Sequence, residues 1–209
     1  NIDKPSGPTS FLISNYVAKE LKLNKTSHMG TLDPQVSGVL PILLGRACRL
    51  SDYFMHKNKT YVGIMRLHKE VDEKNLKETI KKFIGKIKQL PPVRSRVKRA
   101  IREREVISFD LLEIEEKDVL FLTEVQAGTY IRKICDDIGK EIGGAHMLEL
   151  RRVKAGIFEE SSKEFPLYNL YDFDKAVKSY DEGDESLLRN IIIPAEIISQ
   201  VMPSIQFRD

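Results

Sequence analysis

The sequence predicts a mixed α+β fold for its 209 residues. Segments with strand and helix patterns are interspersed along the chain without the strict alternation that a parallel α/β sheet requires. Hydrophobic residues make up 41% of the chain and recur along its whole length, which is enough to bury a real core. The length allows one sizeable domain or two small ones.

The first quarter of the chain contains two predicted helices separated by loops. Residues 1–10 are rich in Gly, Pro, Ser and Thr and are expected to form a loop. Ser10 can cap a helix that continues to about Leu21. Residues 24–34 form a polar loop, and the apolar segment 36–44 leads into a helix that ends near Phe54.

The rest of the chain alternates between strand and helix patterns. Pro91 and Pro92 open an extended basic segment, and Gly143 and Gly144 are expected to end a helix. The acidic stretch after Glu159 should contain one or two further helices. We expect strands at 60–67, 106–114, 119–125 and 148–153, and helices at 76–83 and 129–142.

Charge is distributed unevenly. The net charge is only +3, but residues 81–104 contain ten basic residues and one acidic residue. Residues 159–185 reverse this balance, with nine acidic and three basic residues. A basic segment beside a near-neutral remainder suggests a polyanionic partner on one face, although a solvated charged hairpin explains the pattern about equally well.

The composition argues against several classes of protein. Cys48 and Cys135 lie far apart and form no CxxC pair, which argues against a disulfide framework or a thiolate zinc site. We therefore expect a reducing compartment and two cysteines packed as small hydrophobic residues. The sequence has no apolar run of transmembrane length and no secretory signal.

Five short motifs indicate the function. They occur in this order, with long spacings between them: Asp3-Lys4-Pro5-Ser6-Gly7-Pro8-Thr9-Ser10; His28-Met29-Gly30-Thr31-Leu32-Asp33-Pro34 with Ser37-Gly38-Val39-Leu40-Pro41; Lys59-Thr60-Tyr61-Val62; Ala127-Gly128-Thr129-Tyr130-Ile131-Arg132-Lys133; and Gly144-Ala145-His146-Met147 with Leu150-Arg151-Arg152. A single Leu-Asp-Pro would carry little weight, but five motifs in order are highly specific.

These motifs closely resemble the TruB family of pseudouridine synthases. The segment from Gln89 to Arg99, with its double proline, is similar to the H/ACA branch of that family, which includes dyskerin and its archaeal counterparts. The resemblance covers nearly the whole chain. It implies one catalytic domain over residues 1–209, with a mixed, largely antiparallel sheet, flanking helices and a central RNA-binding cleft. The family usually adds a C-terminal PUA domain, which we expect to lie outside this sequence.

The resemblance also assigns the active site. It implies that Asp33 is the catalytic carboxylate, that Arg132 forms an ion pair with it, and that Tyr61 stacks on the flipped uracil. The Tyr61 hydroxyl is a candidate for proton transfer. His28 would contact or help to extrude the target nucleotide, and Tyr130 and Leu150 would wall the pocket.

The expected chemistry agrees with these residue types. Pseudouridylation moves uracil from an N-glycosidic to a C-glycosidic link without redox change or net hydrolysis, so it needs no cofactor and no metal. It does need an ionised carboxylate, either as nucleophile or as acid/base partner. A fixed arginine counters the desolvation that would otherwise protonate the carboxylate, and an aromatic face receives the extruded base.

Each of these residues also has a plainer interpretation. Asp33 could cap the following segment, Arg132 could be a solvated helix residue, and Tyr61 could belong to a strand core. We expect Lys4 and Arg152 to meet phosphates, although each could be a surface residue. The basic segment should contact RNA through Lys98, Arg99 and Arg102, giving salt-dependent affinity without sequence readout.

The H/ACA resemblance further implies an H/ACA guide RNA, a substrate rRNA or tRNA, and three protein partners. These are a small zinc-binding protein near the active site, a Gly/Arg-rich-type accessory protein, and a kink-turn-binding protein recruited through the guide. The expected location is intracellular: cytoplasmic in an archaeon, nuclear or nucleolar in a eukaryote. Two alternatives stay open, namely a guide-independent synthase for the T-arm of tRNA and a non-catalytic scaffold of a ribonucleoprotein.

Overall fold

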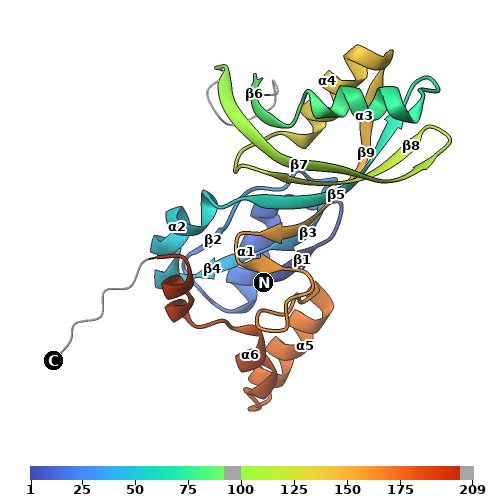
Figure 1. The fold of residues 1–209 in the computed structure, drawn as a ribbon. Coiled ribbons are helices and arrows are strands. Elements are labelled where there is room, and N and C mark those ends of the chain that lie inside the picture. The colour runs from blue at the N-terminus through green and yellow to red at the C-terminus, as the bar shows by residue number, and fades with distance from the viewer. Residues whose placement is uncertain (92–99, 203–209) are drawn as a thin grey trace. The chain divides into compact units, whose positions relative to one another are not determined.

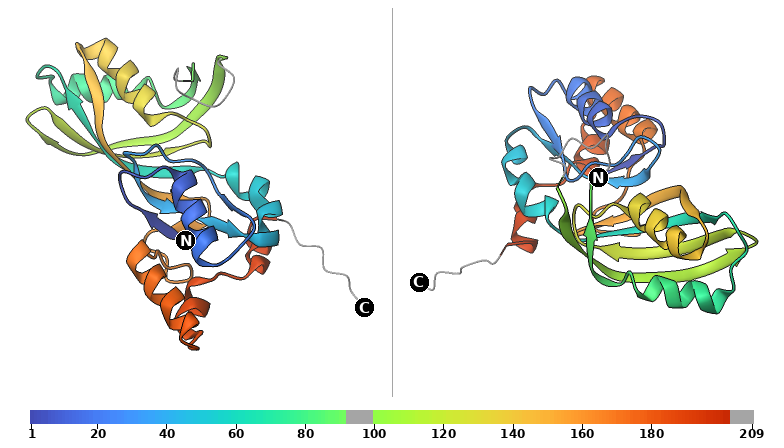
Figure 2. Two further views of the ribbon diagram at one scale, coloured as in Figure 1. Left: turned by 180° about the vertical axis from the view of Figure 1, so that it is seen from behind. Right: turned by 90° about the horizontal axis from the view of Figure 1, so that it is seen from above.

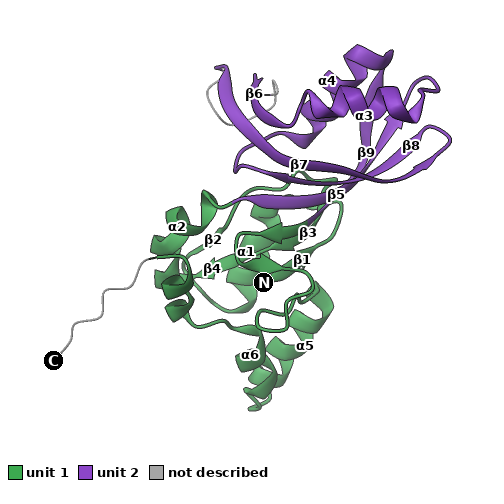
Figure 3. Cartoon of the chain, in the orientation of Figure 1, with its two compact units in different colours: residues 1–57, 153–209 green, residues 58–152 purple. Residues whose placement is uncertain are grey.

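The computed structural model describes residues 1–91 and 100–202. The chain forms two compact units, one made of Asn1–Lys57 with Val153–Asp209 and the other of Asn58–Arg152 (Figure 3). The first unit is therefore discontinuous in sequence, and the second unit is a single contiguous segment.

The first unit combines short antiparallel strand pairs with helices. Strand β1 pairs with β3, β2 pairs with β4, and β10 pairs with the end of β9. Its elements are β1 (Ile2–Lys4), α1 (Ser10–Glu20), β2 (Thr26–His28), β3 (Ser37–Leu40), β4 (Ile42–Leu44), the 3-10 helix η1 (Gly45–Leu50), α2 (Ser51–Met55), β10 (Phe158–Glu159), α5 (Leu170–Asp181), α6 (Ser186–Ile191) and the 3-10 helix η2 (Ala195–Gln200).

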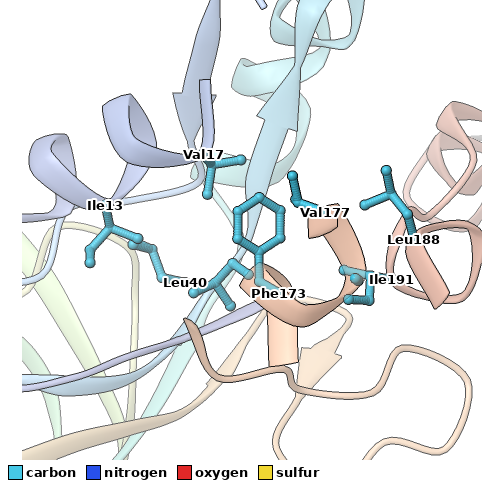
Figure 4. Close-up of a cluster of buried hydrophobic side chains, with 9 residues drawn as sticks. Ile13, Val17, Leu40, Phe173, Val177, Leu188 and Ile191 are labelled. Carbon is cyan, nitrogen blue, oxygen red and sulfur yellow. The ribbon is translucent and has the colours of Figure 1, made fainter. Parts of the chain in front are cut away.

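Two helices of this unit begin at side-chain caps and bury one apolar stripe each. The Thr9 hydroxyl accepts the amide of Leu12 at 3.1 Å, and the Asn169 side chain accepts that of Asp172 at 2.8 Å. Such caps satisfy amides that the first helical turn leaves without partners. The buried stripes meet in one cluster (Figure 4), which contains Ile2, Ile13, Val17, Leu40, Phe173, Ala176, Val177, Leu188 and Ile191.

Backbone hydrogen bonds join the two sequence segments of the first unit. The amide of Asp3 donates to the carbonyl of Tyr168 at 2.8 Å, and the amide of Tyr168 donates to the carbonyl of Asn1 at 3.0 Å. Helices α5 and α6 pack beside one another, as both views in Figure 2 show. The C-terminal segment is thus built into the same core as β1 and α1.

The second unit is a sheet with two helices on one face. Its strand order is β9-β5-β8-β7-β6, and the pairs β5/β8, β8/β7 and β7/β6 are antiparallel. Figure 1 shows α3 and α4 beside one another over this sheet. The elements are β5 (Lys59–Leu67), α3 (Glu73–Lys81), β6 (Gly85–Gln89), β7 (Arg102–Glu115), β8 (Asp118–Val125), α4 (Ile131–Ile142) and β9 (Ala145–Ala155).

Alternate residues of these strands face the helices. On β8 the buried residues are Val119, Phe121, Thr123 and Val125, and β5 buries every second residue in the same way. Phe121 stacks on Phe109 of β7 with 4.7 Å between ring centroids. Helix α4 covers this face with a buried stripe that includes Ile134 and Ile138.

These units confirm the predicted class, a mixed α+β fold with a largely antiparallel sheet and flanking helices. The central RNA-binding cleft stays a prediction. Both cysteines are free and buried, as expected, and burial raises the pKa of the Cys135 thiol to about 12. Among the described residues, no helix is long and apolar enough to cross a membrane.

Several elements differ from the sequence-based expectation. Strands β1 and β2 lie in segments that we expected to be loops, and β6 was not expected at all. The predicted helix before Phe54 is split into a 3-10 turn and the short helix α2. Strands of three residues carry too little pattern to be recognised, because their pairing depends on the partner strand.

Candidate active site

Asp33 lies in a tight, exposed turn of the first unit. The amide of Val36 donates to the carbonyl of Asp33 at 3.0 Å, which closes a four-residue turn with Pro34 at its second position. Proline favours this position because its ring fixes φ near the required value. The Asp33 side chain is exposed, while its neighbours Leu32 and Val36 are buried and anchor the turn on both sides.

Residues of the N-terminal motif form hydrogen bonds with the main chain of this turn. The Lys4 ammonium is fully buried and donates to the carbonyls of Pro5 (2.8 Å), Pro34 (2.9 Å) and Val36 (2.8 Å). The amide of Gly7 adds a bond to the Pro34 carbonyl at 2.8 Å. The phosphate contact that we expected for Lys4 stays a prediction, and these carbonyl contacts give Lys4 a second role, in shaping the Asp33 turn.

Ser10 fixes the other side of the turn. Its hydroxyl accepts the amide of Leu32 at 2.8 Å and lies 3.0 Å from the Leu32 carbonyl, to which it donates. A side chain that bonds both polar atoms of one residue fixes that residue's backbone as a neighbouring strand would. The motif from Lys4 to Ser10 therefore supports the loop that carries Asp33.

His28 lies at the end of β2, before the same loop. Its Nε2 is 3.1 Å from the hydroxyl of Thr31, and its ring is half-buried. The next residue, Met29, is buried and donates its amide to the carbonyl of Pro41 at 3.0 Å. This bond fixes the main chain next to His28, and the contact of His28 with a nucleotide stays a prediction.

Tyr61 lies on the inward face of β5, in the second unit. It is 9% exposed, and the Arg152 guanidinium donates a hydrogen bond to its hydroxyl. Arg152 itself is 1% exposed, so it is not the surface residue of the plainer interpretation. Its contact with phosphate stays a prediction.

Lys59 is a buried cation like Arg152, and it lies on the same face of β5 as Tyr61. Burial, and then the charge of Arg152, lower the pKa of the Lys59 ammonium to about 8. The buried face of β5 contains Lys59, Tyr61, Gly63, Met65 and Leu67. Buried strand positions are usually apolar, so a lysine among them is unusual. Lys59 was not singled out from the sequence, although a charged residue at an inward position of a strand is a signal that could have found it.

Tyr130 and Arg132 flank the start of α4. Tyr130 is the N-cap residue and is half-buried, and Arg132 lies exposed in the first turn. The side chain of Gln89 bonds both main-chain polar atoms of Tyr130: its Oε1 accepts the amide at 3.0 Å and its Nε2 donates to the carbonyl at 3.2 Å. Gln89 is a residue that sequence reasoning missed, because nothing in a lone glutamine at a strand end indicates such a contact.

Leu150 is buried beneath the middle of β5. A Cβ built on Gly63 would lie 2.8 Å from its Cδ1 and 2.7 Å from the ring of Phe121. Because real side chains do not approach this closely, only glycine fits at position 63 while Leu150 keeps its place. The expected wall of the uracil pocket is thus packed tightly within its own unit.

The basic segment forms the antiparallel pair β6/β7. Arg102 pairs with Gln89 in register and is half-buried, and Lys86 forms an ion pair with Glu103 at 3.1 Å. Lys98 and Arg99, which were expected to bind RNA, lie outside the described residues.

The predicted site residues are divided between the two units. Asp33, His28 and Lys4 belong to the first unit, while the residues expected to complete the site belong to the second; they are Tyr61, Tyr130, Arg132, Leu150 and Arg152. Within its own unit the structure joins Tyr61 to Arg152, and the ion pair between Asp33 and Arg132 stays a prediction. Among the described residues, no group of three or more His, Cys, Asp or Glu side chains could hold a metal ion.

Comparisons with known proteins identify the class. Residues 18–78 match the model of the TruB family pseudouridylate synthase N-terminal domain, and residues 132–199 match the tRNA pseudouridylate synthase B C-terminal domain. The chain belongs to the TruB family of pseudouridine synthases.

Similar curated proteins include several from archaea. The chain is 44% identical over its full length to a probable tRNA pseudouridine synthase B of Methanothermobacter thermautotrophicus and covers 64% of that protein. It is 45% identical to the protein of the same name from Thermococcus onnurineus, of which it covers 62%. The chain therefore spans less than two thirds of the length of these relatives.

Solved structures of similar fold include H/ACA assemblies. A Cbf5-Nop10-Gar1 complex matches 97% of this chain with a TM-score of 0.90 and 43% identity. An H/ACA ribonucleoprotein bound to a substrate RNA containing 2′-deoxyuridine matches 97% with a TM-score of 0.86 and 40% identity. In each case the match covers 61% of the known chain.

Proposed function

We propose that this chain is the catalytic part of an RNA pseudouridine synthase, with Asp33 as its catalytic carboxylate. The observation that carries the proposal is the likeness, at 40–43% identity over 97% of the chain, to Cbf5 and to the H/ACA assembly that was solved with substrate RNA. The supported, exposed turn at Asp33 agrees with a carboxylate that must meet a nucleotide.

The reaction breaks the bond between ribose C1′ and uracil N1, turns the base, and joins C1′ to C5. The C5 proton leaves and N1 gains a proton, so atoms and charge balance without a co-reactant. Asp33 supplies the negative charge beside the sugar and base, either by attack on C1′ or by addition to the base. Lys4 and Ser10 hold the Asp33 turn in place, which limits the reorganisation that the step requires.

The remaining site residues serve the base. Tyr61 stacks on the extruded uracil and offers its hydroxyl for proton transfer, with Arg152 orienting that hydroxyl. Arg132 pairs with Asp33 and keeps it ionised. Tyr130 and Leu150 enclose the base, and His28 contacts the nucleotide as it leaves its stack.

We further propose that an H/ACA guide RNA selects the target uridine. Similar solved structures contain Nop10 or Gar1, which supports small protein partners for this chain. We propose that these partners are a small zinc-binding protein and a Gly/Arg-rich-type accessory protein. A kink-turn-binding protein would join through the guide RNA. Arg102, Lys98 and Arg99 would contact phosphates of the bound RNA.

The deciding experiment measures pseudouridine in a transcript after incubation with the intact protein and its small protein partners, with and without a matching guide. Guide-dependent product is expected, and Asp33→Ala should form none while it still binds RNA. Activity of Asp33→Ala at the parental level would refute the assignment of the carboxylate.

A second function is favoured by the names of the archaeal relatives, which are called tRNA pseudouridine synthase B. In that case the protein modifies the T-arm of tRNA without a guide, and the same assay would yield product in tRNA when the guide is omitted. A non-catalytic scaffold would instead give no product in either reaction and would retain its biological output as Asp33→Ala.

A further inference from the structure

Helix α4 has no side-chain cap at its N-terminus. The amide of Thr129 donates to the carbonyl of Gln126 at 3.2 Å, closing a turn in which Gly128 has φ of 80°. Tyr130 follows as the N-cap residue of α4, and its side chain makes no capping hydrogen bond. The Tyr130 backbone therefore needs support from elsewhere in the unit.

Gln89, the last residue of β6, provides this support. Both polar atoms of its side-chain amide bond the main chain of Tyr130, at 3.0 and 3.2 Å, and the residue is 2% exposed. The Tyr130 carbonyl also accepts the amides of Lys133 and Ile134, at 3.1 and 3.2 Å, which begins α4. Gln89 thus bonds the same carbonyl that starts the helix carrying Arg132.

The partner strand β7 holds the same loop from its own side. The carbonyl of Glu105 accepts the amide of Gln126 at 2.9 Å. The guanidinium of Arg104 packs on Gly128, because a Cβ built there would lie 3.3 Å from its Nε. Both strands of the basic pair therefore contact the loop that leads into α4.

We propose that Gln89 is a positioning residue that ties the basic strand pair β6/β7 to the main chain of Tyr130. The inference rests on the proposed function, since it concerns residues of the same site. The main-chain torsions of Tyr130 direct its side chain toward the base and set the first turn of α4, where Arg132 lies. Exposed Lys86 and Lys88 lie on the strand that ends at Gln89. RNA bound to that strand would steady the loop through this amide.

Two substitutions separate this role from simple packing. Gln89→Met keeps the length of the side chain and removes both hydrogen bonds. Gln89→Glu keeps the acceptor for the Tyr130 amide but cannot donate to its carbonyl when ionised. Gln126→Met is the matched control, because the Gln126 side chain is exposed and only the main chain of this residue forms the hydrogen bonds described above.

The test compares single-turnover pseudouridine formation and RNA affinity in the intact, assembled protein. Gln89→Met should lower the rate by about tenfold or more with RNA affinity changed less than about twofold, since small misplacements of catalytic groups cost large factors in rate. Gln89→Glu should also fall below the parent, and Gln126→Met should match it. Parental rates in both folded Gln89 variants would overturn the inference.

Hydrogen exchange gives a readout that does not depend on turnover. The Tyr130 amide should exchange slowly in the parent and slow further when RNA binds. In Gln89→Met it should exchange faster, and RNA should no longer protect it. Exchange equal to that of the parent would refute the Gln89 contact. A parent that forms no pseudouridine in any assay would instead refute the proposed function and leave the exchange result standing.

Discussion

Buried residues of β5 and of its neighbour β9 carry charges that a core strand normally excludes. Lys59 of β5 is 4% exposed and Arg152 of β9 is 1% exposed, and Arg152 bonds the hydroxyl of Tyr61, which shares one face of β5 with Lys59. Burying a cation costs free energy, so such residues are retained where they do something besides packing. Here the arginine fixes the direction of a hydroxyl that we assign to the active site.

The buried Lys59 ammonium should make the free energy of unfolding depend on pH in the alkaline range. Below pH 8 the ammonium is protonated in both the folded and the unfolded chain, so its burial cost is fully present. Between pH 8 and 10.5 the folded chain loses this proton first, and the contribution of Lys59 to the free energy of unfolding should rise by about 3 kcal/mol. Cys135, whose thiol pKa is raised, shifts the stability of the parent and of Lys59→Met alike, so denaturant unfolding should show the rise as a growing difference between the two proteins. A difference that stays constant with pH would contradict the burial of the charge.

Arg132 should act on rate rather than on affinity. Arg132→Lys keeps the positive charge but loses the planar fork that pairs with a carboxylate at two points. We expect single-turnover formation of pseudouridine to fall by about tenfold with RNA affinity unchanged, a decrease of about 1.4 kcal/mol in transition-state stabilisation. An unchanged rate would exclude the ion pair with Asp33. Lys133→Arg, one position away, is the matched control.

At the scale of elements, the segment from β1 to the start of α1 shapes the Asp33 turn. Its sequence was predicted to be a loop because Gly, Pro, Ser and Thr dominate it. In the structure this segment contains strand β1. Lys4 donates a hydrogen bond to the carbonyl of Pro34, and the Ser10 hydroxyl accepts one from the amide of Leu32. Segments 30 residues apart meet in this contact, which no local pattern can indicate.

Lys4→Met should therefore destabilise the first unit. The substitution keeps the length of the side chain and removes hydrogen bonds to three main-chain carbonyls. Bonds to charged donors contribute more than neutral ones, so we expect the free energy of unfolding to fall by about 3 kcal/mol. Lys19→Met, at an exposed position of α1, should change it by less than about 0.5 kcal/mol. Similar values for the two variants in denaturant titrations would contradict the support role.

The longer elements could be predicted because their periodicity is strong. Strands β5 and β8 bury every second residue, and α4 buries one continuous stripe, so their positions follow from the sequence to within a few residues. The strand β6 could not be predicted, since its alternating Lys86, Ile87 and Lys88 are part of a basic run with few apolar residues. Its pairing with β7 decides its structure, and with it the place of Gln89.

The same contrast holds for the candidate site. Asp33, Tyr61 and Arg132 were found from motifs that resemble a family, and the composition alone would have indicated only a basic RNA-binding domain. Gln89, which supports Tyr130 at the start of α4, was missed because it acts through a contact between a strand and a loop that the sequence does not order. Motifs thus predict which residues react, and the structure shows what holds several of these residues in place.

At the scale of the whole molecule, the basic charge of β6 should govern affinity for RNA. Neutralising Lys86 and Lys88 to alanine should weaken binding and reduce the slope of log K against log salt by about one unit for each phosphate that the protein no longer neutralises. The matched control is Lys175→Ala with Lys178→Ala, on exposed positions of α5. If both double variants show the parental slope in binding titrations, β6 does not contact RNA.

The discontinuity of the first unit also determines when it can fold during synthesis. A ribosome releases β1, α1 and β3 early, but their apolar cluster needs Phe173, Val177 and Leu188 from the far end of the chain. Residues 58–152 emerge in between as one contiguous unit with local strand pairs, so they should be the first to acquire a stable fold. Until α5 and α6 leave the exit tunnel, the nascent segment bearing Asp33 lacks half of its core, and in this interval a chaperone would have exposed apolar surface to bind.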